Sequence, residues 1–138
     1  MKIVIDSNRV IASLIKEGTT REILFDKKFE FFAPEFIKSE IDKYKEDILN
    51  KSGLTNEEFE VLLSLIFEYI KIIPESEYGY LLDDINLDIE DINDIPYLAV
   101  CLFIHANCIW THDSHFKEQN KCKVFTNIDM LNLGNKID

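Results

Sequence analysis

Short apolar runs recur along the chain, separated by longer stretches of mixed polarity. The first run, at residues 2–5, is rich in β-branched residues and stops at an acid, which is typical of a buried parallel strand. Runs of similar character predict further strands at FEFFA (29–33), IKII (70–73), CIWT (108–111) and KVFT (123–126).

The stretch after the first run carries helix signals. Residues 7–17 form a candidate helix that ends near Gly18. A second helix is expected to begin with Thr19 or Thr20 as its N-cap, because a hydroxyl at this position accepts a hydrogen bond from the first helical turn.

Further helices follow the second and third apolar runs. Pro34 is expected to open a helix, and its apolar stripe is formed by Phe36, Ile37, Ile41, Tyr44 and Ile48. Thr55 and Glu58 form a capping box that opens a helix running to about Tyr69. Residues 95–106 place their apolar side chains on one helical face.

This alternation of strands and helices predicts an α/β fold with a mostly parallel central sheet, arranged as a three-layer α/β/α domain. The strand at residues 2–5 is expected inside the sheet rather than at its edge. The chain has no internal repeat and no linker-like segment, so residues 1–138 are interpreted as a single domain.

Charge is spread unevenly along the chain. The net charge is −11, but residues 75–94 alone carry eight acids and no Lys or Arg. Across residues 1–53 the acids and bases cancel. The overall charge therefore argues only weakly against a polyanionic partner such as a nucleic acid.

The cysteines and the apolar segments bear on the compartment. Cys101, Cys108 and Cys122 form an odd set without a C-x-x-C pair, so we interpret them as free thiols in a reducing compartment. The apolar run at the amino terminus is too short for a signal peptide, and no stretch is long enough to span a membrane. We therefore expect a cytoplasmic protein without a membrane partner.

Acidic residues recur where the predicted strands end. Asp6 follows the first strand and Asp113 follows CIWT, and an open parallel sheet binds its ligands at the carboxyl ends of strands. Glu40 lies on the apolar stripe of its helix, where a carboxylate is costly unless a cation or hydrogen-bond donors meet it. Asp94 directly precedes the last predicted helix.

Each acid also has a simpler interpretation. Asp94 can serve as an ordinary N-cap, and Glu40 can extend to water or pair with Lys43. Taken together, however, clustered carboxylates repel one another, and a hard divalent cation such as Mg²⁺ or Mn²⁺ makes such a cluster tolerable. A cluster of this kind suits metal-assisted cleavage of a phosphodiester bond.

Three motifs carry a resemblance to a known family. KIVIDSNRVIASLI, APEFIKSEI and DINDIPYLAVCLFIHANCIWTHDSHF resemble, in this order, the opening strand, the glutamate-bearing helix and the closing acidic module of a PIN domain. This is the nuclease fold of VapC-type toxins, of the PilT N-terminus type and of related RNA-processing enzymes. The resemblance covers nearly the whole chain.

The resemblance implies a metal-dependent endoribonuclease that uses Mg²⁺ or Mn²⁺. The implied catalytic and metal-binding residues are Asp6, Glu40, Asp94 and Asp113, with Asp91 as an auxiliary acid and Asn8 and Thr111 as supporting polar residues. One or two ions are expected, about 4 Å apart if two bind.

The resemblance also implies single-stranded RNA as the substrate and the toxin role of a toxin–antitoxin pair. It raises an antitoxin protein and a second copy of the chain as partners. The basic residues expected to contact nucleic acid are Arg9, Arg21 and Lys38. The path predicted for the phosphate backbone is extended by Lys16, Lys43, Lys117 and Lys121.

Other functions remain open from the residues alone. His112 and His115 flank Asp113, but a zinc site needs three or four converging ligands, and His105 belongs to another element. A receiver domain requires an acidic pair after the first strand, where this chain has Ser7 and Asn8 instead. The alternative from another class is a non-catalytic binding module that keeps the fold for protein or RNA contact.

Overall fold

The computed structural model of the chain describes residues 1–85, 91–113, 116, 119 and 121–137. The strands are β1 (Lys2–Ile5), β2 (Glu30–Pro34), β3 (Ile70–Ile73), β4 (Cys108–Trp110) and β5 (Val124–Phe125). The helices are α1 (Ser7–Ile15), α2 (Thr19–Leu24), α3 (Phe36–Lys43), α4 (Lys45–Ser52), α5 (Asn56–Glu68), α6 (Glu75–Tyr78), α7 (Leu82–Ile85), α8 (Ile95–Phe103) and α9 (Asn127–Lys136), with short 3-10 helices η1 (Gly79–Leu81) and η3 (Ile92–Asp94).

The strands form one parallel sheet in the order β3-β2-β1-β4-β5. β1 lies inside the sheet, where Ile3 pairs with Phe31 of β2 and with Cys108 of β4. Ile3, Val4 and Ile5 are each fully buried because helices cover both faces of the strand. The predicted parallel sheet and the interior place of its first strand are confirmed.

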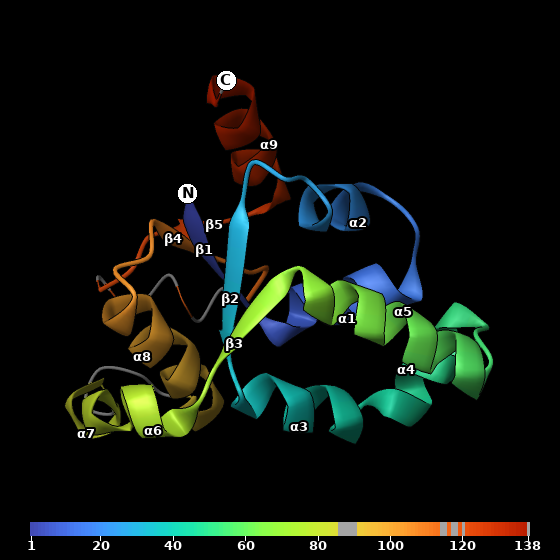
Figure 1. The fold of residues 1–138 in the computed structure, drawn as a ribbon, viewed down its shortest axis with the longest axis horizontal. Coiled ribbons are helices and arrows are strands. Elements are labelled where there is room, and N and C mark those ends of the chain that lie inside the picture. The colour runs from blue at the N-terminus through green and yellow to red at the C-terminus, as the bar shows by residue number, and fades with distance from the viewer. Residues whose placement is uncertain (86–90, 114–115, 117–118, 120, 138) are drawn as a thin grey trace.

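Helices cover the two faces of the sheet, so the domain has the predicted three layers. Figure 1 shows α8, with α6 and α7 beside it, on one side of the strands and α1 with α5 on the other. α8 packs against β1, β2 and β4. No helix within the described residues is both long enough and apolar enough to span a bilayer.

The helix predicted to start at Pro34 differs from the expectation at both ends. Pro34 is the last residue of β2, and α3 begins at Phe36, so the proline ends a strand, where its missing N–H is tolerated. The expected single helix is broken at Tyr44 into α3 and α4. Ile48 remains fully buried after the break, while Tyr44 is 43% exposed.

Other helix ends are also corrected. Gly18, not Thr19 or Thr20, is the N-cap of α2, because the Thr20 hydroxyl accepts hydrogen bonds from other elements of the fold. α1 ends at Ile15, and α8 ends at Phe103, two residues before the backbone turns at His105 with a φ of 55°. The capping box of Thr55 and the helix it opens are confirmed.

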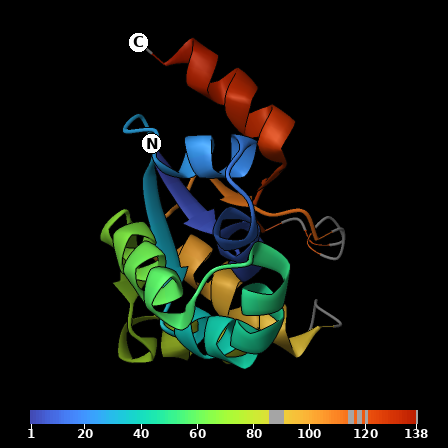
Figure 2. The same cartoon turned by 90° about the vertical axis from the view of Figure 1, so that its right-hand side faces the viewer.

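α9 is an element for which the sequence analysis made no prediction. It begins with a second capping box, in which the Thr126 hydroxyl accepts from the N–H of Asp129 and the Asp129 carboxylate accepts from the N–H of Thr126. Figure 2 shows α9 at the opposite end of the molecule from α3 and α4. Trp110 reaches its first turn, since the indole Nε1 donates to Asn127 Oδ1 at 2.8 Å.

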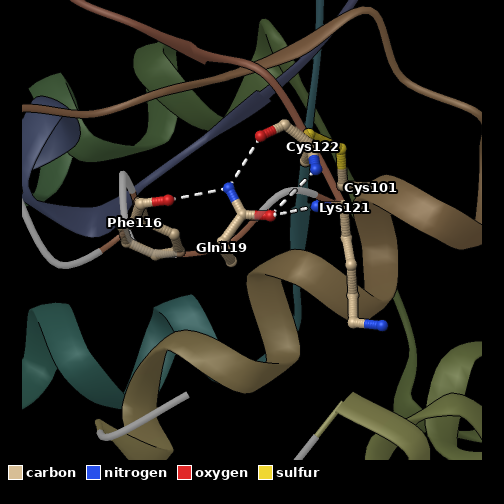
Figure 3. The surroundings of a disulfide bond; sticks show 5 residues. All are labelled: Cys101, Phe116, Gln119, Lys121 and Cys122. Carbon is tan, nitrogen blue, oxygen red and sulfur yellow. Dashed lines mark hydrogen bonds between the residues drawn. A yellow bond between two sulfur atoms is a disulfide. The ribbon is translucent and has the colours of Figure 1, made fainter. Parts of the chain in front are cut away.

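The expectation of three free thiols is wrong for two of them. Cys101 on α8 and Cys122 before β5 form a disulfide, and Cys108 is the free, buried thiol among the described residues. The side-chain amide of Gln119 fixes the same segment: its Nε2 donates to the carbonyls of Phe116 and Cys122, and its Oε1 accepts from the N–H groups of Lys121 and Cys122 (Figure 3). The pairing of β5 with β4 brings Cys122 to α8, a proximity that cysteine spacing does not reveal.

Candidate metal centre

An acidic cleft of about 350 Å³ opens beside the carboxyl ends of β1 and β4. The described residues that line it are Asp6, Ser7, Asn8, Ile11, Glu40, Tyr44, Asp47, Asp91, Asn93, Asp94 and Asp113. We refer to this set as the acidic cleft. All four principal acids predicted from the sequence, together with the auxiliary Asp91, therefore line one cavity.

Asp6 enters the cleft directly after β1. Its N–H donates to the Trp110 carbonyl at 3.1 Å, which continues the pairing of β1 with β4 by one residue. The residue stands at the N-cap position of α1, but its side chain does not cap the helix; instead it accepts a hydrogen bond from Thr111. Burial, and to a smaller degree the negative charges of Glu40 and Asp113, raise the pKa of Asp6 from 3.8 to about 6.

Thr111 joins two of the acids. Its hydroxyl donates to Asp6 Oδ2 at 2.7 Å and accepts from the N–H of Asp113 at 2.9 Å. The hydroxyl also accepts from Asn8 Nδ2 at 3.2 Å, so its donor and its acceptor lone pairs are all used. Thr111 and Asn8, both predicted as supporting residues, therefore hold Asp6 and Asp113 in a fixed relation at the ends of neighbouring strands.

Glu40 reaches the cleft from α3 and is half-buried. Burial is the main cause that raises the pKa of its carboxyl group, and hydrogen bonds from Tyr97 and Ser7 oppose this effect. The phenol of Tyr97 on α8 donates to Glu40 Oε1. Burial and the nearby charge of Glu40 in turn raise the pKa of the Tyr97 phenol far above its usual value, so the phenol stays protonated.

Asp91, Asp94 and Asp113 form the tightest group of acids. Each offers a carboxylate oxygen, and these atoms all lie within 4.8 Å of one another. Asp91 caps η3, since its Oδ1 accepts from the N–H of Asn93 at 3.0 Å. Asp94 is 6% exposed and stands at the N-cap position of α8, but its side chain makes no capping hydrogen bond to that helix. The simpler interpretation of Asp94 as an ordinary N-cap is therefore wrong.

The donor set of the acidic cleft fits a hard divalent cation. Carboxylate oxygens are the ligands that Mg²⁺ and Mn²⁺ prefer, and three of them within 4.8 Å can converge on one ion. Burial is the largest cause that raises the pKa values of Asp6 and Glu40 and the neighbouring acids add to it, so a bound cation would favour their charged forms. Asp6 and Glu40 line the same cleft outside the tight group.

Two of the predicted nucleic-acid contacts are engaged within the protein. Arg9 is 9% exposed, and its guanidinium donates to Asn8 Oδ1 at 3.0 Å and to Thr20 Oγ1 at 3.4 Å. Burial lowers the pKa of Arg9, and the charge of Asp6 opposes this. Arg21 donates twice to the Ser13 carbonyl, at 3.0 and 2.7 Å, near the end of α1.

Lys38, the third predicted contact, is exposed on α3, and its ammonium group lies 5.7 Å from the centre of the Phe67 ring. Lys16, Lys43 and Lys121 are also exposed, whereas Lys117 lies outside the described residues. Lys43 is close enough to Glu40 to lower the pKa of that carboxyl group slightly against the effect of burial.

A larger groove of about 500 Å³ lies between α3 and α5, but none of the predicted acids lines it. Its walls include Ile41, Phe59, Leu63 and Phe67, and its best-defined polar contact is the Lys45–Glu60 ion pair at 2.9 Å. This lining offers no converging set of ligands, so we place the chemistry in the smaller acidic cleft.

Sequence reasoning missed Tyr97 and Ser7. Both contact Glu40, and Tyr97 lies three residues after Asp94, so the two share one face of the helix start. That spacing was the available signal for Tyr97. Ser7 follows Asp6 directly and gave no signal of its own.

The chain matches a known protein family over most of its length. Residues 4–124 match the family model described as "PIN domain". No curated protein matches the chain.

Proposed function

The chain belongs to the PIN domain family, and from this premise we propose that it is a metal-dependent endoribonuclease that cleaves single-stranded RNA. PIN domains are typically nucleases that use divalent metal ions, and the acidic cleft is compatible with that chemistry. One observation carries the proposal: the predicted acids come from four separate parts of the chain and line a single cleft, and three of them offer oxygens within 4.8 Å of one another.

In this proposal Asp91, Asp94 and Asp113 hold an Mg²⁺ or Mn²⁺ ion, and Asp6 and Glu40 complete the set of ligands. A bound divalent cation supplies an activated water molecule and neutralises charge on the scissile phosphate. Thr111 keeps Asp6 and the backbone of Asp113 in register, so the ligands on the two strand ends keep their spacing.

RNA must approach a cleft that is itself strongly acidic. Metal binding reduces this charge, and exposed basic side chains near the cleft then attract the phosphate backbone of the RNA. Lys38 is exposed on α3 but lies over Phe67 and lines the groove between α3 and α5, whereas Lys43 acts on the Glu40 carboxylate and lies over Tyr44 of the cleft, so Lys43 is the better placed for this role. The Lys43→Ala variant is expected to weaken RNA binding across sequences and to lower its salt dependence by about one counterion, and Lys38→Ala is expected to have a smaller effect.

The test is incubation of the purified protein with labelled single-stranded RNA and DNA in Mn²⁺, in Mg²⁺ and in EDTA. Wild-type protein should cut RNA only with metal, and Asp6→Asn should be inactive. Asp42→Asn is the matched control, because Asp42 is an exposed acid on α3 outside the acidic cleft. Cleavage that survives EDTA or Asp6→Asn would contradict the proposal. RNA binding without cleavage or metal binding would favour the non-catalytic module.

The proposal extends to a toxin role with an antitoxin protein as partner. The support is the family alone, so the test is biological. Induced expression of the wild-type chain in a bacterial host should stop growth, and expression of Asp6→Asn should not. Equal growth with both chains, at equal protein levels, would contradict this part. We also propose that a second copy of the chain is a partner, and light scattering of the purified chain tests this homodimer separately.

A further inference from the structure

We propose that Tyr97 is a positioning residue for the metal site, whose phenol fixes the Glu40 carboxylate in the orientation that a cation in the acidic cleft requires. The inference rests on the proposed function, because it takes the cleft to bind a divalent cation. Its direct basis is the hydrogen bond that the Tyr97 phenol donates to Glu40 Oε1.

Tyr97 and Asp94 come from the same short stretch of chain. Asp94 stands at the N-cap of α8, and Tyr97 follows in its first turn, so an i, i+3 relation places both side chains on one face. Asp94 is 6% exposed and Tyr97 is 1% exposed. α8 therefore brings to the cleft both a candidate ligand and the group that holds another ligand on α3.

The ring of Tyr97 is itself held rigidly. It is buried in the core and meets the Phe116 ring edge to face, with ring centres 6.4 Å apart. A buried ring in a fixed position has little rotamer freedom, so its hydroxyl is a donor at a defined point. Glu40 is only half-buried and has a longer, more flexible side chain. Because the core fixes the position of the ring, the hydrogen bond limits the orientations that the Glu40 carboxylate can adopt.

A tyrosine suits this role because it is a neutral donor. A lysine or arginine in its place would cancel the charge of Glu40 and compete with the cation. Among the described residues that line the acidic cleft there is no lysine or arginine, so none of these residues competes with a metal for the carboxylates. The Tyr97 phenol donates to Oε1 of Glu40 and Ser7 also bonds this carboxylate, and the remaining lone pairs of its two oxygens are left for the cation.

The test is the Tyr97→Phe variant, which keeps the ring contact with Phe116 and removes only the hydroxyl. The dissociation constant for Mn²⁺ is measured by calorimetry and by the electron paramagnetic resonance signal of the free ion. The variant should bind Mn²⁺ about 10- to 100-fold more weakly, the range typical for loss of a group that orients a ligand. Near-ultraviolet circular dichroism and the melting temperature without metal report whether the fold is kept.

Tyr78→Phe is the matched control. Tyr78 is also buried, at 2% exposed, but it lies on α6 and does not line the acidic cleft. Its substitution should leave the affinity for Mn²⁺ unchanged. A double-mutant cycle adds Glu40→Gln: without the Glu40 carboxylate, Tyr97→Phe should have no further effect on Mn²⁺ affinity.

The outcomes separate this inference from the proposed function. Wild-type protein that binds no Mn²⁺ overturns both. Wild-type protein that binds Mn²⁺ while Tyr97→Phe binds it equally well overturns only the role of Tyr97. A loss of affinity that persists undiminished in the Glu40→Gln background also overturns it, because the effect then does not pass through Glu40.

Discussion

Replacing Asp6 by Asn is expected to stabilise the metal-free protein. Asn has nearly the same shape and can still accept the Thr111 hydrogen bond, but it carries no charge. The shift of the Asp6 pKa from 3.8 to about 6 corresponds to about 3 kcal/mol, at about 1.36 kcal/mol per unit of pKa. This is the upper limit of the gain, and a measured value of about 1 to 3 kcal/mol is expected.

The gain should depend on pH in a defined window. Because the folded pKa of Asp6 is raised, the folded state binds its proton more tightly than the unfolded state does. Ionisation of Asp6 therefore does not lower the free energy of unfolding of the wild type below pH 3.8. Its destabilising effect grows as the pH rises to about 6. The difference between Asp6→Asn and the wild type should be small at pH 4 and reach its full value above pH 6.

The assay is urea unfolding in EDTA at pH 4 and pH 8, with Asp42→Asn as an exposed control that should change little. At pH 8 the melting temperature should rise by about 2–4 °C for each kcal/mol, the range for chains of similar length. Added Mn²⁺ should stabilise the wild type more than Asp6→Asn, because ligand binding to the folded state adds stability. The reasoning is refuted if Asp6→Asn is less stable at pH 8, or if its gain is the same at both pH values.

Three further predictions concern the disulfide, the metal site and a helix cap. The two cysteines of the disulfide are 21 residues apart, so its reduction should lower the free energy of unfolding by about 3 kcal/mol, because the unfolded chain gains loop entropy. Urea unfolding with and without reductant measures this loss of stability. An equal effect of reductant on Cys122→Ser would contradict the prediction. Asp91→Asn should weaken Mn²⁺ binding about tenfold or more in calorimetry, whereas Asp42→Asn should not, and equal affinities would remove Asp91 from the site. Thr55→Ala should cost about 1 kcal/mol in urea unfolding because the capping box of α5 is lost, and unchanged stability would show that tertiary packing alone holds that end.

The sheet could be predicted from the sequence because its signals are local. The buried run at residues 2–5 and the capping box at Thr55 each fix an element through neighbouring residues. The break at Tyr44 could not be seen in this way, because Ile48 keeps the apolar spacing across it. Acids in the first turn of α4 favour a new helix start there, but they are equally common on a continuous exposed face.

The site was predictable to the extent that strand ends define it. Asp6 and Asp113 were expected together because neighbouring parallel strands end at one edge, and they line the same cleft. Asp91 belongs to the closest group of acids because of the turn of η3, which no sequence pattern specified. Arg9 shows the opposite limit: a basic residue on the helix that follows Asp6 is expected at a phosphate, yet its burial and its hydrogen bonds to Asn8 and Thr20 follow from tertiary packing.

The interior position of β1 affects how the protein is made. A ribosome releases β1 before β4, its neighbour on one side, which follows only after α8 has been synthesised. Until β4 has emerged, one edge of β1 in the nascent chain is unpaired, and such edges are prone to pair with other chains. The hydrogen bond from the Thr111 hydroxyl to Asp6 likewise forms only after Thr111 has been synthesised. The set of acids in the cleft is therefore complete only when the segment around Asp113 has emerged.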